Sequence, residues 1–370
     1  MEEKQIKEQL PYAYSLHAIW PLSGRKLWML TEKIGMPKQI YECETDRMKE
    51  VLNPKQIETL ERSRENWNVQ GEWEKLKKQN IYFLPFFHPF YPEKLSNIPD
   101  PPWALYWKGR LLERNLQTVA VVGARQCSEY GRFAAKAIGK CMGENGILTI
   151  SGMARGIDGI SQEATLDAGG SSLAVLGCGV DICYPKENRR LYERLEKNGG
   201  ILSEYPPGTK PLAAYFPPRN RIISGLGDVL VVVEAKEKSG TLITVDMALE
   251  QGKEVLVLPG RITDALSSGC NRLIKQGAGV LTSMEDIFHL LGVENRKTKE
   301  EKTRKLFFDT EEERKIYEIL DFMPKNIEKI WEEYGKEKIT VQQLMSVLLK
   351  LCLRGMVAQM GGSYHRRAEE

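Results

Sequence analysis

Residues 118–158 read TVAVVGARQCSEYGRFAAKAIGKCMGENGILTISGMARGID, and this stretch determines the fold. Two short apolar runs, Val119–Val122 and Ile147–Ile150, flank a segment whose apolar residues recur at helical spacing. Buried strands that alternate with helices form right-handed βαβ units, in which helices cover both faces of a parallel sheet. The sequence therefore predicts an α/β protein with a parallel sheet.

The same alternation continues toward residue 292. The further apolar runs are Leu173–Leu176, Ile201–Ser203, Val229–Val233, Val255–Leu258 and Val280–Leu281. Segments with helical spacing lie between these runs. We expect residues 118–292 to form one extended Rossmann-like domain.

Three smaller regions surround this domain. Residues 1–80 contain short amphipathic helices, which predict a helical module. In residues 81–117 several prolines forbid a long helix and predict an extended, turning connection. Residues 293–306 are nearly all charged or polar and favour a solvated linker. Residues 307–370 show three helical stretches and a glycine hairpin signal, a pattern typical of a winged helix-turn-helix.

The composition is that of a globular protein and excludes a mainly disordered or fibrous chain. The 370-residue chain is 42% hydrophobic and 28% charged, as globular proteins are, and its net charge of +3 alone does not indicate a nucleic-acid partner. No apolar run approaches the roughly 20 residues of a membrane span, so we expect a cytoplasmic protein without membrane insertion. Seven cysteines without C-x-x-C pairs and four scattered histidines predict reduced thiols and no metal site.

Ligands of an open parallel sheet bind outside the carboxyl ends of the strands, so the loops there are the candidate site. The first loop, Gly123–Gly131, lacks the G-x-G-x-x-G spacing of dinucleotide-binding proteins, and we predict no cofactor. Its Arg125 is suited to bidentate contact with a phosphate. In the second loop, Ser151–Asp158, glycines allow backbone N–H groups to approach an anion, although a tight turn without a ligand is an alternative. Asp158 is equally suited to orienting this loop as a helix cap.

Later loops combine cations with aromatic side chains, which suits a single-stranded nucleic acid whose bases stack while Lys and Arg neutralise its backbone. Ser239-Gly240-Thr241 opens a helix and adds a further anion site. Together the loops predict a phosphate-holding edge of the sheet. The candidate binding residues are Gly123, Arg125, Ser128, Ser151, Gly152, Met153, Arg155, Gly156, Lys186, Lys210, Phe216, Arg219, Asn220, Arg221, Ser239, Gly240 and Thr241.

Catalytic groups are not evident in this region. Residues 118–288 contain no histidine, and no pair of carboxylates shows a readable acid–base pattern. We therefore predict a binding protein rather than an enzyme, with no catalytic residue.

Several motifs resemble those of the DNA-processing protein DprA (Smf) family over nearly the whole chain. They are Tyr91-Pro92-Glu93, Asp100-Pro101-Pro102, Val122–Arg125, Ser151–Asp158, Phe216–Leu226, Ser239–Thr241, Pro259-Gly260 and Gly269–Ile274. The resemblance implies a protein of competence, natural transformation and DNA recombination. Such a protein binds and protects incoming single-stranded DNA, takes part in RecA loading and forms a dimer through its Rossmann-like domain.

The resemblance also implies roles for individual regions. The family's phosphate-gripping arginine corresponds to Arg125, and its basic rim to Lys186, Lys210, Arg219 and Arg221. The amino-terminal helices resemble a SAM-like or helix-hairpin-helix-like module, and the carboxyl-terminal region resembles a winged helix.

The sequence also bears on two alternative functions. A nucleotide phosphoribohydrolase uses a similar core, but its P-G-G-x-G-T motif precedes a glutamate that is missing from Glu237–Thr244. A transcription regulator would read DNA with the helix Thr340–Arg354, which carries Lys350 and Arg354 as its only cations. That helix favours protein contact or weak duplex binding.

Overall fold

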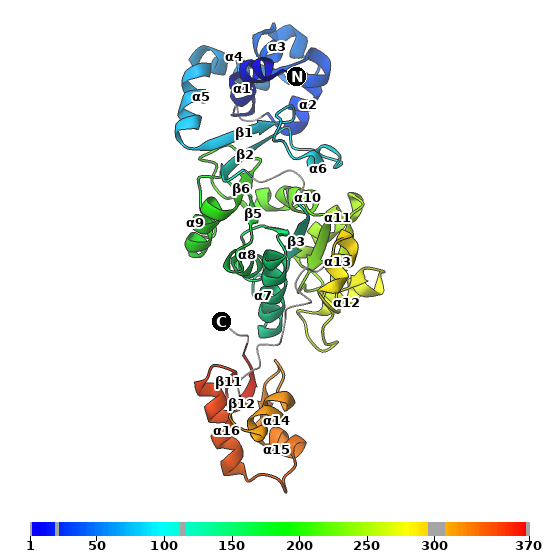
Figure 1. Cartoon of the computed structure of the whole chain (residues 1–370). Helices are drawn as coiled ribbons and strands as arrows, with labels where there is room; N and C mark the ends of the chain where they lie inside the picture. Colours follow the sequence, from blue (N-terminus) through cyan, green and yellow to red (C-terminus); the bar gives the residue numbers. More distant parts are fainter. Residues whose placement is uncertain (1, 19–21, 112–115, 295–307, 368–370) are drawn as a thin grey trace. The chain divides into compact units, whose positions relative to one another are not determined.

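The computed structural model describes residues 2–18, 22–111, 116–294 and 308–367. These residues form two compact units (Figure 1). The first contains the residues before 295 except Cys127–Ala134, and the second contains that short segment with the carboxyl-terminal residues.

A nine-stranded sheet forms the framework of the first unit. Its strands are β1 (Ile81–Pro85), β2 (Ala104–Gly109), β3 (Thr118–Val122), β4 (Leu148–Ser151), β5 (Ser172–Leu176), β6 (Gly200–Ser203), β7 (Val229–Val232), β8 (Glu254–Val257) and β9 (Gly279–Val280). The order is β1-β2-β6-β5-β4-β3-β7-β8-β9, and the seven strands from β6 to β9 are parallel to one another. The predicted α/β fold with a Rossmann-like parallel sheet is confirmed.

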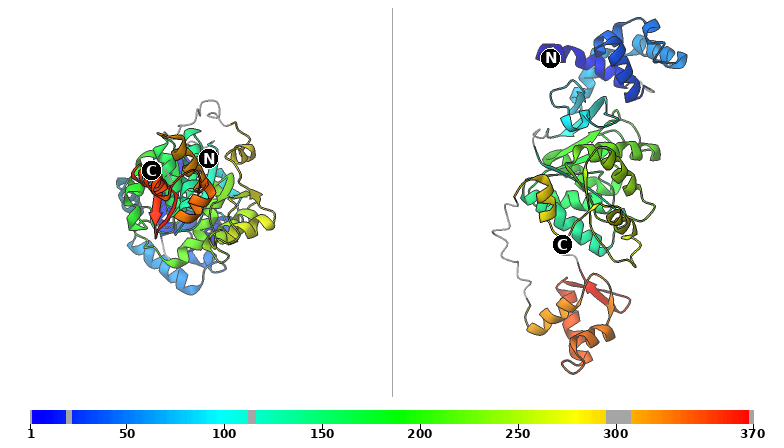
Figure 2. Two further views of the ribbon diagram at one scale, coloured as in Figure 1. Left: turned by 90° about the horizontal axis from the view of Figure 1, so that it is seen from below. Right: turned by 90° about the vertical axis from the view of Figure 1, so that its right-hand side faces the viewer.

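Helices cover both faces of this sheet (Figure 2). They are α7 (Glu129–Glu144), α8 (Ile157–Asp167), α9 (Arg189–Asn198), α10 (Phe216–Leu226), α11 (Gly240–Glu250), α12 (Ser268–Lys275) and α13 (Glu285–Leu291). Successive residues of a strand contribute to the hydrophobic cores on opposite faces of the sheet. In β5, Ala174 and Leu176 pack on one face, and Leu173 and Val175 pack on the other. The chain runs outward from β3 to β6 and then crosses to β7, so the strand order reverses between β3 and β7.

The segment 81–117 differs from the extended connection that the sequence predicts. Its strands β1 and β2 pair antiparallel, and β2 also pairs with β6, so both belong to the main sheet. Prolines exclude a long helix but are tolerated at the ends of edge strands, as Pro85 is at the end of β1. A short helix, α6 (Glu93–Ser96), lies between the two strands.

In the described residues, five helices precede the sheet: α1 (Glu3–Ala18), α2 (Gly24–Ile34), α3 (Pro37–Glu42), α4 (Pro54–Asn66) and α5 (Val69–Lys78). A 3₁₀ turn, η1 (Thr45–Met48), follows α3. These helices pack directly on the first two strands, because Tyr14 contacts the rings of Phe83 and Tyr106. The helical module therefore shares one continuous core with the sheet, and this core reaches Ile201 in β6.

The described carboxyl-terminal residues of the second unit form short helices and strands. They are α14 (Glu311–Ile319), β10 (Lys325–Asn326), α15 (Ile327–Tyr334), α16 (Val341–Leu353), β11 (Val357–Met360) and β12 (Ser363–Arg366). Its strands pair in the order β10-β12-β11. Of the two cations predicted on the helix Thr340–Arg354, Arg354 pairs with Glu313 and Asp309, and Lys350 is exposed.

Most of the predicted linker, residues 295–306, lies outside the described residues. Within the described ranges, no helix combines the length and apolar character needed to cross a membrane.

Candidate functional site

A pocket of about 580 Å³ lies at the carboxyl ends of β3 and β7, where the strand order reverses. Ligands of open α/β sheets bind at this position, because the loops on either side turn away from each other. Eight of the predicted residues line the pocket: Gly123, Arg125, Phe216, Arg219, Asn220, Ser239, Gly240 and Thr241. The structure thus brings together the loop after β3 and the first turns of α10 and α11.

Two guanidinium groups lie close to one aromatic ring in this pocket. The central carbon of Arg125 lies 6.0 Å from the ring centroid of Phe216, and that of Arg219 lies 5.8 Å from it. Arg125 is exposed, whereas Arg219 is buried. The site therefore presents one accessible cation and one enclosed cation beside a flat apolar surface, an arrangement that also allows cation–π attraction.

Tyr184 extends the aromatic surface. Its ring lies 5.5 Å from that of Phe216 at an interplanar angle of 32°, and its side chain is exposed. The sequence indicates the loop Tyr184-Pro185-Lys186, but the tyrosine itself is not among the predicted binding residues. The signal available was an aromatic residue beside a cation in a loop after a strand.

Arg219 holds the surrounding backbone in place. Its Nη1 donates hydrogen bonds to the carbonyl oxygens of Gly152, at 3.2 Å, and Val175. Its Nε donates to Oδ1 of Asn220 at 3.3 Å. Burial lowers the pKa of Arg219 to about 10, against the opposing effect of the Asp158 carboxylate. The guanidinium therefore stays charged at neutral pH and adds a fixed positive charge to the pocket.

The carboxylate of Asp158 orients the loop after β4. Its Oδ2 accepts a hydrogen bond from the N–H of Gly152 at 3.1 Å, and burial raises its pKa. A Cβ at Gly152 would lie 2.7 Å from Nη2 of Arg219 and 2.8 Å from Oδ2 of Asp158. Glycine is therefore required between the two charged groups, and Asp158 acts on the loop from within the protein.

The loops after β3 and β4 are locked together at Gly156. This residue has a φ of +74°, and a Cβ there would overlap the carbonyl oxygen of Ala124. The same oxygen accepts a hydrogen bond from the N–H of Ile157 at 3.2 Å. Because Ala124 directly precedes Arg125, the contact fixes the backbone that carries the exposed guanidinium.

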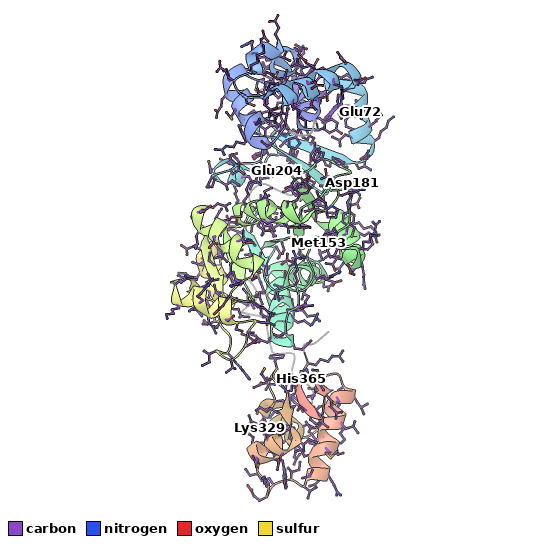
Figure 3. The ribbon with its side chains drawn as sticks, turned by 180° about the vertical axis from the view of Figure 1, so that it is seen from behind. Glu72, Met153, Asp181, Glu204, Lys329 and His365 are labelled. Carbon is purple, nitrogen blue, oxygen red and sulfur yellow. The ribbon has the colours of Figure 1, made fainter. Side chains whose placement is uncertain are left out.

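Met153 (Figure 3) supports the loop from the core side. It adopts a φ of +53°, which is uncommon for a residue with a side chain, and it is buried. Its N–H donates to Gln162 at 3.0 Å, and its carbonyl oxygen accepts from Nδ2 of Asn188 at 3.0 Å. Met153 was predicted as a binding residue, but its side chain packs in the core because these bonds turn it away from the pocket.

Ser128 and Ser151 hold backbone in the structure. Ser128 accepts a hydrogen bond from the N–H of Gly131 at 3.1 Å, near the start of α7. Ser151 is buried, and its hydroxyl donates to the carbonyl oxygen of Val121 at 2.6 Å, which links β4 to β3. Neither side chain lines the pocket.

Three of the predicted cations, Arg155, Lys186 and Lys210, lie outside the lining of the pocket. Arg155 is exposed, pairs with Glu187 and borders a smaller hollow of about 50 Å³ that also touches Arg125 and Arg219. Lys186 and Lys210 are exposed and lie outside the lining of both hollows.

Arg221 departs from the prediction that it belongs to the basic rim. It is buried, with Nε 2.9 Å from Oδ2 of Asp100 and Nη2 2.8 Å from Oε1 of Glu204, which Figure 3 labels. Residues two positions apart on a helix point about 200° away from each other, so Arg219 and Arg221 leave α10 on opposite sides. Arg221 therefore joins structural elements instead of facing the pocket.

No group of three or more His, Cys, Asp or Glu side chains in the described ranges is placed to hold a metal ion. The polar groups that line the pocket are guanidinium, amide and hydroxyl groups together with Asp158. The guanidinium, amide and hydroxyl groups can donate hydrogen bonds to an anion, whereas the carboxylate of Asp158 is an acceptor and takes a hydrogen bond from the N–H of Gly152.

The model of the family called DNA recombination-mediator protein A matches residues 82–292, which include the whole pocket. The chain belongs to the DNA recombination-mediator protein A family. It is 46% identical over 199 residues to DNA processing protein DprA of Streptococcus pneumoniae, a match covering 53% of this chain and 70% of that protein. It is 42% identical over 217 residues to protein Smf of Escherichia coli, covering 58% of each.

Solved structures of the DNA recombination-mediator protein A family agree. The X-ray structure of DNA processing protein A from S. pneumoniae matches with a TM-score of 0.67 and 34% identity, covering 75% of this chain and 97% of that one. A structure of DNA processing protein A from Helicobacter pylori, described for its single-stranded DNA binding mode, matches with a TM-score of 0.52 and 29% identity. That match covers 57% of this chain and 95% of the H. pylori chain.

Proposed function

We propose that the pocket between β3 and β7 binds single-stranded DNA and that the protein acts as a recombination mediator without catalytic turnover. The observation that carries this proposal is the placement of Arg125 and Phe216 side by side in the lining of the pocket. A single strand offers phosphates to a guanidinium and unpaired bases to a ring. The single-stranded DNA binding mode described for the H. pylori relative supports the same ligand class.

Each group in the pocket has a separate role in this proposal. Arg125 contacts a phosphate bidentately, and the amino terminus of α11 at Gly240 and Thr241 adds a favourable dipole. Bases stack on Phe216 and Tyr184. Arg219 is too enclosed to follow a moving strand, so it stabilises the anion through its fixed charge.

The exposed lysines extend the positive surface. Lys186 and Lys210 lie outside the pocket and contact backbone phosphates on either side of the bound nucleotides. Such contacts neutralise charge without reading sequence, so binding is expected to tolerate any base.

The cellular role, the protein partner and the oligomeric state are proposed by analogy with the family. We propose that the protein works in the cytoplasm during natural transformation, protects incoming single strands and loads RecA onto them. We also propose that it does so as a homodimer formed through the Rossmann-like domain. Light scattering is expected to give twice the mass of one chain, and RecA is expected to hydrolyse ATP sooner on single strands that carry the protein.

A gel-shift series tests the central proposal. Oligo-dT and a duplex of equal length are titrated with the full chain at several salt concentrations, and oligo-dT is expected to bind more tightly. Its affinity should fall linearly with the logarithm of the salt concentration. Tighter binding of the duplex, or release of free base from nucleoside monophosphates at enzymatic rates, would overturn the proposal.

A further inference from the structure

The loop that follows β8, residues 260–267, holds an apolar side chain out into solvent. Ile262 is 95% exposed, more than any other large hydrophobic side chain in the described ranges. Arg261 and Thr263 on either side of it are also exposed. Full exposure of an isoleucine leaves apolar surface in water. A bound ligand that covered this side chain would therefore be favoured by the hydrophobic effect.

The loop is braced in one conformation by its own hydrogen bonds. At its base, the side-chain amide of Asn271 bonds to both the N–H and the carbonyl oxygen of Gly260, at 3.3 and 3.0 Å. Within it, Oδ1 of Asp264 accepts from the N–H of Leu266 at 2.9 Å, and the N–H of Asp264 donates to Arg261 at 3.1 Å. The tip is thus pre-organised, which reduces the entropy lost when a ligand binds.

This loop stands at the same edge of the sheet as the pocket. Strands β3, β7 and β8 are parallel neighbours, so the loops after them share one edge. The N–H of Ala235, after β7, donates to the carbonyl oxygen of Leu266 at 2.9 Å and ties the two loops together. Two strand spacings amount to roughly 10 Å, the length of about two to three nucleotides.

Exposed cations lie on the two loops that this hydrogen bond ties together. Lys236 and Lys238 are exposed on the loop after β7, and Arg261 directly precedes Ile262. Glu237 is the exposed carboxylate between the two lysines. The two tied loops therefore carry three cations against two carboxylates, the exposed Glu237 and the half-buried Asp264, and this excess of positive charge suits a polyanion that continues from the pocket.

We propose that the 260–267 loop is a second contact for the single strand, in which Ile262 packs against the bases that leave the pocket. Lys236, Lys238 and Arg261 neutralise the adjoining phosphates. Apolar side chains such as isoleucine insert between neighbouring bases of duplex DNA, and the unpaired bases of a single strand expose the same apolar faces. The excess of cations on the two tied loops favours a polyanionic strand as the occupant of the tip. This inference rests on the proposed binding of single-stranded DNA.

The test compares Ile262→Ser with the wild-type chain on oligo-dT of increasing length. Oligonucleotides of about two residues are too short to span the roughly 10 Å between the pocket and the 260–267 loop, so both proteins should bind them equally. On oligonucleotides of about fifteen residues, the variant is expected to bind roughly tenfold more weakly, because the burial of one isoleucine side chain is lost. The salt dependence should not change, since no charge is removed.

Leu249→Ser serves as the matched control. Leu249 is 58% exposed near the carboxyl end of α11, away from the proposed track, and its replacement should leave binding of every length unchanged. A Lys236→Ala, Lys238→Ala double variant should bind long oligonucleotides with a salt slope smaller by roughly 1.4. A slope equal to that of the wild type would remove these lysines from the track.

The outcomes separate this inference from the proposed function. If the wild type binds long oligo-dT and Ile262→Ser binds it equally well, the second contact is excluded and the pocket proposal stands. If the wild type binds no oligo-dT, the pocket proposal itself fails. If Ile262→Ser binds DNA normally but no longer stimulates RecA, the tip contacts protein and the second DNA contact is overturned.

Discussion

The central guanidinium carbon of Arg125 lies 6.0 Å from the ring centroid of Phe216, although one residue follows β3 and the other begins α10. The contact exists because the strand order reverses beside β3 and brings these two segments to one pocket. A charged group and a ring are thereby offered to the same ligand.

Arg125→Ala is expected to weaken binding of oligo-dT about tenfold, because a charge-assisted hydrogen bond to phosphate is lost. The slope of log affinity against log salt should become shallower by about 0.7, the value for one phosphate contact on a single strand. Titration by gel shift at four or more salt concentrations measures both quantities. Unchanged affinity in a folded variant would remove Arg125 from the site.

Arg125→Lys is the matched control for charge. The lysine keeps the positive charge but not the planar fork, so the salt slope should match the wild type while affinity falls. A slope as shallow as that of Arg125→Ala would mean that the lysine does not reach the phosphate.

Phe216→Leu is expected to lower affinity by about 1–3 kcal/mol without altering the salt slope, because stacking is lost and charge is kept. Combining it with Arg125→Ala should give less than the sum of the two single effects, since the groups touch. Fluorescence anisotropy with a labelled oligo-dT provides the four affinities. Strict additivity would show that the two side chains bind the strand independently.

Arg221→Ala is expected to destabilise the fold by about 3 kcal/mol and to leave the affinity of the folded fraction unchanged. The substitution leaves the largely buried carboxylate of Glu204 without its cationic partner. Denaturant unfolding measures the loss, and Arg190→Ala provides a control because Arg190 is exposed. A stable Arg221→Ala protein with weak DNA binding would return Arg221 to the basic rim.

The parallel sheet could be predicted because its strands are continuous apolar runs. Val119–Val122 and Leu173–Leu176 are buried from end to end, and such runs are readable without knowledge of their neighbours. The loops at the carboxyl ends of the strands could also be predicted, because each loop begins where a continuous apolar run ends. Eight of the candidate residues meet in one pocket because parallel strands deliver their following loops to one edge.

Side-chain direction could not be predicted. Arg219 and Arg221 are alike in sequence, yet one faces the pocket and the other faces Asp100 and Glu204. The difference depends on where α10 begins, and a shift of one residue turns the helix by 100°. The pairing of β2 with β6 was likewise missed, because its partner lies about 95 residues further along the chain.

Acid is expected to destabilise the fold through His17. Its ring is surrounded by Phe83, Trp103 and Tyr106, and burial lowers its pKa from 6.5 to about 4. Between these values the unfolded chain binds a proton that the folded protein does not, so the free energy of unfolding falls as pH drops from about 6.5 to 4. Urea unfolding at several pH values measures this slope.

His17→Gln should flatten the slope in that window, because the group that titrates differently in the two states is gone. His289→Gln is the control, since His289 is exposed. An acid slope that is equal in His17→Gln and the wild type would assign the effect to other groups.

The continuous core between the amino-terminal helices and the sheet also has a consequence for biosynthesis. Tyr14 leaves the ribosome early, but the strands that complete its core extend to Ile201. At about 5–20 residues per second, roughly ten to forty seconds of translation separate the two. During that time the nascent helices carry an uncovered apolar face, so chains that stall before β6 should be bound by chaperones or degraded.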